Sequence, residues 1–148
     1  EPAARFAAKV RDIHEFLVDI GIEAPAAGTV PLRVTYQEPC HLAHAQRITA
    51  QPRQLLRQIA GLELCEMAES AVCCGSAGVY NVIQPDMALR LGSRKIDHAL
   101  ASGADVIATA NPGCAVQLAG ELQRRGATTP VRYIVELLDD AYRRAEDA

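Results

Sequence analysis

The chain has 148 residues, and 15 Lys and Arg against 18 Asp and Glu give a net charge of −3, with 49% hydrophobic and 22% charged residues. This is the profile of one globular domain, large enough to bury a core without disulfides or a structural metal. The basic residues form no stripe of the kind that nucleic-acid binding needs, so we expect no nucleic-acid partner. No apolar run approaches the roughly 18 residues that span a bilayer, and no signal peptide is recognisable, so we expect a cytoplasmic chain without a transmembrane segment.

The first residues have the spacing of an amphipathic helix. Four apolar residues recur at helical intervals, namely Phe6, Val10, Ile13 and Leu17. Gly21 then supplies a left-handed stop. We therefore expect one helix over residues 3–20 within a leading segment, 1–28, of a single domain that covers 1–148. Because the sequence starts at Glu1 and enters this pattern at once, we expect further domains upstream.

Strand and helix patterns alternate through the rest of the chain. Runs rich in β-branched, aromatic and other apolar residues predict strands at 31–36, 62–67, 105–110 and 131–134. Helical patterns lie between and after them, at 52–61, 85–100, 114–125 and from 136 onward. This alternation predicts an α/β fold with a mostly parallel sheet and helices on both faces.

Four of the five cysteines follow three of these strands. Cys40 follows the first strand, Cys73 and Cys74 follow the second, and Cys114 follows the third. The carboxyl ends of parallel strands meet at one edge of a sheet, so we expect these four thiols to converge there. Thiolates are the soft ligands of zinc, copper(I) and iron–sulfur clusters. The sequence therefore predicts a metal site with these four cysteines as ligands.

Glycines accompany the cysteines in the same loops. Gly75, Gly78 and Gly113 allow positive φ and a close approach of the backbone to a bulky cofactor, and their amides are free to donate hydrogen bonds to cluster sulfur. We expect these three glycines to contact the cofactor.

The adjacent pair Cys73–Cys74 bears on the type of metal. Neighbouring side chains diverge and do not easily take two corners of one zinc tetrahedron, whereas they can reach two irons of one cluster. A dithiol switch between them is a further alternative, although a disulfide between neighbours is strained. Cys65 lies inside a strand pattern, where we expect it to serve packing alone.

Two histidines lie close to the first cysteine. Cys40, His41 and His44 form a Cys-His-x-x-His pattern that could contribute to a mixed Cys/His site. The alternative is that these histidines orient the loop backbone beside a ligand.

Three segments carry a resemblance to a known family, and they lie at 38–46, 73–81 and 109–114. Their Cys40, Cys73–Cys74–Gly75 and Cys114 resemble the cysteine-rich CCG domain of iron–sulfur oxidoreductases. More narrowly, they are similar to the C-terminal domain of the bacterial glycolate oxidase iron–sulfur subunit. The fuller family motif ends in Cys-x-x-Cys, and this chain has Gln117 at the last position.

The resemblance implies an electron-transfer domain without catalytic residues of its own. It implies four cysteine ligands for one [4Fe–4S] cluster, or for zinc as the alternative. The implied partners are an FAD-containing dehydrogenase subunit that oxidises a 2-hydroxy acid and upstream iron–sulfur domains of the same subunit. Electrons would pass toward a membrane acceptor, at the inner face of the membrane.

Other functions stay open at this point. Related families include lactate-utilisation proteins and subunits of glycerol-3-phosphate dehydrogenase and heterodisulfide reductase. A different class of function is a docking or structural domain that binds zinc or no metal and holds the flavin subunit.

Overall fold

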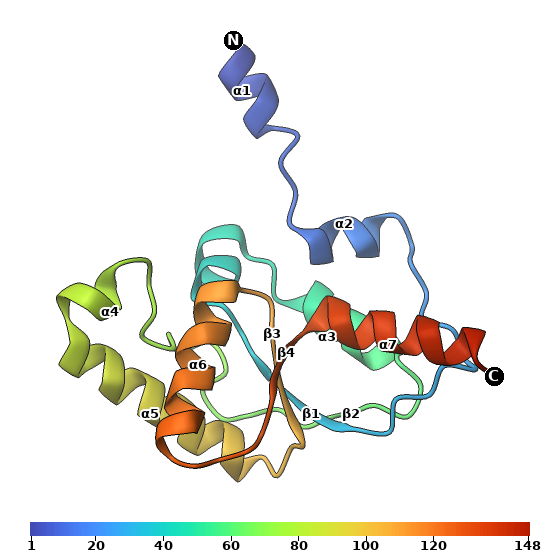
Figure 1. The fold of residues 1–148 in the computed structure, drawn as a ribbon. Helices are drawn as coiled ribbons and strands as arrows, with labels where there is room; N and C mark the ends of the chain where they lie inside the picture. The colour runs from blue at the N-terminus through green and yellow to red at the C-terminus, as the bar shows by residue number, and fades with distance from the viewer.

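The computed structural model describes residues 1–148 and contains a four-stranded parallel sheet between two helical layers (Figure 1). The strands are β1 (Arg33–Gln37), β2 (Glu63–Leu64), β3 (Val106–Thr109) and β4 (Val131–Tyr133). They lie in the order β2-β1-β3-β4, and every neighbouring pair is parallel. The predicted α/β class with a parallel sheet is confirmed.

Each face of the sheet has its own hydrophobic core. On one face, Val34, Val106 and Ala108 pack with the helices α3 (Ala50–Gln58) and α7 (Ile134–Glu146). On the other face, Ile107 packs with α5 (Pro85–Ala101) and α6 (Pro112–Arg124). Successive residues of β3 point to opposite faces, as the two-residue period of a strand requires. The helices therefore cover both faces, as predicted.

The leading segment differs from its prediction. The single helix expected over 3–20 is wrong, because two short helices form, α1 (Pro2–Ala7) and α2 (Ile13–Asp19). Asp12 caps α2, and its side chain accepts a hydrogen bond from the His14 amide at 2.9 Å. No residue of α1 is buried. Figure 1 shows α1 projecting away from the sheet, whereas α2 lies near α3.

The cysteine-bearing side contains two short elements that the sequence did not predict. They are the π-helix η1 (His41–Gln46) and the helix α4 (Tyr80–Ile83). Strand β2 is shorter than the expected 62–67, because beyond Cys65, whose amide still donates to the Val34 carbonyl, the chain leaves the sheet edge. Helix α6 begins at Pro112, two residues earlier than expected.

None of the helices combines the length and the apolar character that crossing a lipid bilayer requires.

Candidate metal centre

The site lies where the sheet reverses its order. From β1 the chain passes through α3 on one face, and from β3 it passes through α6 on the other face. Loops that leave neighbouring parallel strands toward opposite faces open a crevice beyond the strand ends. A cavity of about 520 Å³ is lined by the residues that follow β1, β2 and β3.

All four predicted cysteines line this cavity. Its lining is made of Cys40, His41, Cys73, Cys74, Ser76, Ala77, Gly78, Asn111, Gly113 and Cys114. The structure thus brings together the thiols that the strand-end argument placed at one edge. No Asp, Glu, Lys or Arg side chain belongs to the lining, so sulfur supplies most of its donor atoms. Cys65 is absent from the lining and contacts Glu63 instead, with Sγ 3.5 Å from Oε1.

The sulfurs are spread around the cavity in two pairs. Cys40 Sγ lies 3.9 Å from Cys73 Sγ, and both side chains are half-buried. Cys74 and Cys114 are buried and hydrogen-bonded to each other. No group of three or more His, Cys, Asp or Glu side chains is arranged to hold a single metal ion.

The inner pair shares a proton unequally. The hydrogen bond from the Cys114 thiol, helped by the Ser76 amide, lowers the pKa of Cys74 to about 6 against the opposing effect of burial. The same contact, together with burial, raises the pKa of Cys114 far above its ordinary value. Burial also raises the pKa of Cys73, although the Gly75 amide opposes this. The metal-free pair therefore loses its first proton readily and its second with difficulty.

The three predicted glycines have distinct roles. Gly75 has φ of +93°, its amide donates to Cys73 Sγ at 3.3 Å, and a Cβ there would lie 2.4 Å from the Ala88 carbonyl oxygen. Gly78 has φ of +64° and lines the cavity. The expectation of positive φ is wrong for Gly113. Its hydrogen matters because a Cβ would lie 3.0 Å from Ser76 Oγ, where two cysteine loops meet.

The helix that carries Cys114 is capped inside the site. Asn111 ends the extended segment after β3, and its Oδ1 accepts a hydrogen bond from the Cys114 amide at 3.0 Å. Pro112 occupies the first turn, where the lack of an N–H costs nothing. The cap therefore fixes Cys114 in the first turn of α6, facing the cavity.

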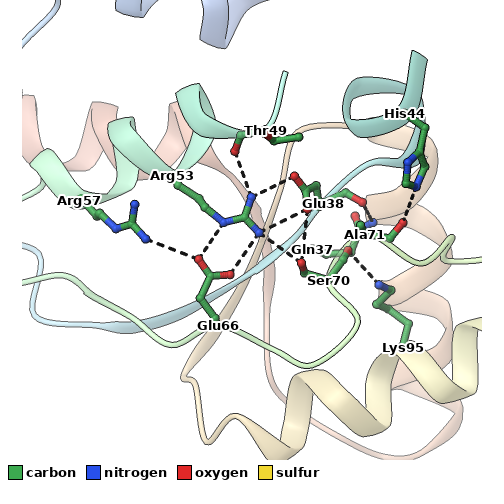
Figure 2. Close-up of polar contacts among 10 residues, drawn as sticks. All are labelled: Gln37, Glu38, His44, Thr49, Arg53, Arg57, Glu66, Ser70, Ala71 and Lys95. Atoms are coloured by element: carbon green, nitrogen blue, oxygen red, sulfur yellow. Dashed lines mark hydrogen bonds and ion pairs between the residues drawn. The ribbon is translucent and has the colours of Figure 1, made fainter. Parts of the chain in front are cut away.

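An arginine ties two cysteine loops together behind the cavity (Figure 2). Arg53 donates to Glu38 Oε1 at 3.0 Å and to Glu66 Oε1 at 2.8 Å. It also donates to Ser70 Oγ at 3.2 Å. Glu38 precedes Cys40 by two residues, and Ser70 precedes Cys73 by three. The sequence analysis missed Arg53, and one guanidinium connects the segments that lead to both thiols.

Two further side chains hold the backbone just before Cys73 (Figure 2). Lys95 Nζ donates to the carbonyls of Glu69 at 2.6 Å and Ser70 at 3.0 Å. His44 Nε2 hydrogen-bonds the Ala71 carbonyl at 3.1 Å. His44 thus has the backbone-orienting role considered from the sequence, whereas His41 lines the cavity.

Comparison with known proteins agrees with this arrangement of cysteines. The family model CCG, described as "Cysteine-rich domain", matches residues 34–119, which contain β2, β3, nearly all of β1 and all four cavity cysteines. The chain belongs to the CCG cysteine-rich domain family. The resemblance stated from its motifs is therefore confirmed.

Curated relatives of this CCG domain are longer proteins. The chain is 38% identical to the "Probable glycolate oxidase iron-sulfur subunit" of Bacillus subtilis (strain 168), over 95% of this chain and 32% of that protein. It is 31% identical to "Lactate utilization protein A" of an Exiguobacterium species, over 97% of this chain and 58% of that protein. It is 38% identical to a subunit of the "Fumarate reductase (CoM/CoB)" of Methanothermobacter marburgensis, over 90% and 27%. The chain thus spans less than two thirds of each of these relatives.

Gln117 occupies the position where the fuller CCG motif has its last cysteine. Its Oε1 accepts from Asn81 Nδ2, and its Nε2 donates to the Ala88 carbonyl, both at 3.5 Å. Gln117 is not part of the cavity lining. In this CCG domain the position therefore links α6 to α4 and α5.

Proposed function

We propose that this CCG domain binds one [4Fe–4S] cluster in its cysteine-lined cavity and serves as an electron-transfer domain of a glycolate-oxidase-type complex. The observation that carries the proposal is the gathering of four thiols from three strand-end loops around one cavity without charged lining. Cys40, Cys73, Cys74 and Cys114 are the proposed ligands. Such a cluster, when bound, supplies one-electron transfer.

The spacing of the thiols supports a polynuclear group over a single zinc ion. Zinc needs four donors about 2.0 to 2.3 Å from one point. Here no three candidate side chains are arranged around one point, and the adjacent residues Cys73 and Cys74 pair with different partners. A cluster distributes its irons, so its ligands attach at separate places.

The chain's own residues account for how such a site is held and tuned. The Gly75 amide already donates to Cys73 sulfur, and amide hydrogen bonds to ligand sulfur stabilise its negative charge. The inner pair needs little free energy to release its first proton, which favours ligation by Cys74. We assign no catalytic residue to this domain.

The names of the relatives support the place of the domain in a redox complex. One is called an iron–sulfur subunit of glycolate oxidase, another is a subunit of a fumarate reductase, and a third is a lactate utilization protein. We propose an FAD-containing dehydrogenase subunit as the electron donor and a 2-hydroxy acid as its substrate. Further iron–sulfur domains of the same subunit and a membrane acceptor complete the proposed relay, which places the domain at the inner face of the membrane.

Metal analysis tests the ligand assignment. The chain, reconstituted anaerobically with ferrous iron and sulfide, should bind about four irons and four sulfides. Serine at Cys40, Cys73, Cys74 or Cys114 should lower this content, and Cys65→Ser is the matched control that should not. One zinc per chain without sulfide after purification, or iron lost only in the Cys65 variant, would contradict the proposal.

Half-reactions in the assembled complex test the role. Cys73→Ser and Cys74→Ser should slow electron transfer to the acceptor, whereas reduction of flavin by the 2-hydroxy acid should persist. The block would then lie after substrate oxidation. Normal transfer to the acceptor in both variants would exclude a relay through this site.

A further inference from the structure

Lys95 is a buried cation without a carboxylate partner. Only 2% of the residue is exposed, and its ammonium donates to the carbonyls of Glu69 and Ser70. No carboxylate oxygen lies within 4.0 Å of it, and the carboxylate of Glu69 is instead engaged by Arg94 at 2.5 Å and His98 at 3.2 Å. Lys95 is thus held by neutral acceptors alone.

A buried charge in this state is expensive. Backbone carbonyls satisfy its hydrogens, but they do not neutralise its charge, and an uncompensated charge inside a protein costs several kcal/mol. Burial accordingly lowers the pKa of Lys95, and attraction to the sulfurs of Cys74 and Cys73 is the main effect that opposes this. The cysteine site is therefore the natural source of the compensating negative charge.

We propose that Lys95 is a positioning residue that also supplies the positive charge which stabilises the anionic cysteine site. The proposal rests on the proposed function, because four thiolates around a [4Fe–4S] core carry net negative charge, and reduction adds one more. A fixed cation close to the site favours the more negative, reduced state. Through the Glu69 and Ser70 carbonyls, the same ammonium also holds the segment that leads to Cys73.

Arg53 provides a contrast within the same structure. It binds the segment 66–70 from the other helical layer, but Glu38 and Glu66 neutralise its charge. Arg53 therefore holds the loop without giving net charge to the site. The two cations separate the positioning effect from the electrostatic effect.

The test compares charge with hydrogen bonding at position 95. Lys95→Arg keeps both, Lys95→Gln keeps a donor without the charge, and Lys95→Met removes both at similar length. In the reconstituted chain, we expect the Gln and Met variants to lower the reduced-to-oxidised ratio of the cluster about tenfold at a fixed potential, equal to about 59 mV for one electron. Lys95→Arg should restore the wild-type potential.

A second readout needs no cluster. In the metal-free, reduced chain at pH 7, we expect iodoacetamide to react several-fold more slowly with the Gln and Met variants, because the thiolate is less stabilised. Lys95→Arg should react at the wild-type rate. If Lys95→Met does not fold, Lys95→Gln decides.

The outcomes separate the two proposals. Wild-type potential and wild-type alkylation rate in Lys95→Gln would overturn the charge assigned to Lys95, whatever the metal content. A wild-type chain that takes up no iron and sulfide would overturn the proposed function, and the alkylation rates alone would then decide on Lys95. A potential shift in Lys95→Arg equal to that in Lys95→Met would show a steric effect and also overturn the proposal.

Discussion

Arg53 and Glu38 form an ion pair behind the cysteine loops, with Nη1 3.0 Å from Oε1 and with only 17% and 6% of their side chains exposed. The Arg53 guanidinium also lies 5.1 Å from the centre of the Tyr36 ring. This pair joins the end of β1 to α3 on the side of the sheet that carries the cysteines. Its loss should therefore affect both folding and metal binding.

Removing Arg53 should be strongly destabilising. Arg53→Met leaves Glu38 buried without its partner, and breaking a buried pair in this way costs about 3–5 kcal/mol of unfolding free energy. Urea unfolding of the metal-free chain measures the effect. Arg57→Met is the control, because Arg57 is 62% exposed and 3.7 Å from Glu66, a contact worth about 0–1 kcal/mol. Equal losses in the two variants would contradict a special role for Arg53.

A methyl group at Gly75 should disturb the site more than one at Gly78. Both glycines have positive φ, which costs a non-glycine residue roughly 1–2 kcal/mol. At Gly75 the added Cβ would also lie 2.4 Å from the Ala88 carbonyl, whereas at Gly78 it meets no atom within 4 Å. We expect Gly75→Ala to lose about 1–3 kcal/mol more, and to bind less iron. The contact with α5 is unimportant if the two variants match in stability and iron content.

The stability of the metal-free chain should depend on pH through Cys74. Its pKa of about 6 in the folded chain lies below the ordinary 9.0, so between these values the unfolded chain binds more protons and stability rises with pH. Above about pH 9, Cys73 and Cys114 keep protons that the unfolded chain loses, and stability should fall.

Unfolding in urea from about pH 5.5 to 10.5, under reducing conditions, tests this pH dependence. Cys74→Ser should abolish the rise between about pH 6 and 9, and Cys65→Ser should keep it. A wild-type chain with constant stability over that range would show that the inner pair does not hold its proton as described.

The two leading helices should differ in their contribution to stability. No residue of α1 is buried, so deleting residues 1–9 should change the unfolding free energy by less than about 0.5 kcal/mol. His14 of α2 is buried, and Leu17 and Val18 pack on the core, so deleting residues 1–20 should cost about 2–5 kcal/mol. Thermal unfolding of both truncated chains distinguishes them. A large loss on the shorter deletion would mean that α1 packs on the domain.

The predictable parts of this molecule are those that local patterns specify. Proline-started helices, β-branched runs and the alternation of strand and helix indicated the sheet class, and the place of each cysteine after a strand indicated the cavity. The break at Asp12 was missed because the apolar period continues across it, while only packing against α3 decides which part stays helical on the body. The length of β2 was missed because one partner strand ends its pairing at Leu64.

The support of the cysteine loops shows two kinds of missed signal. Lys95 lies within the buried stripe of α5, which includes Ala88, Gly92, Ile96 and Ala99. A lysine at such a position is a signal that sequence reasoning could have used. Arg53 and Glu38 carry no local signal, because they are 15 residues apart in different elements and their pairing depends on how α3 docks on β1.

The long intervals between the cysteines have a consequence for biosynthesis. Cys40 and Cys114 follow β1 and β3, which pair only after the chain between them has folded into β2 and α5. During translation, the first thiols leave the ribosome well before the last one, and bringing distant segments together is slow. Until α6 docks, the early cysteines are open to premature metal capture or oxidation. Delivery of a cofactor to this cavity therefore belongs after the third strand is in place, and a maturation factor that recognises the finished sheet edge would meet all the ligands at once.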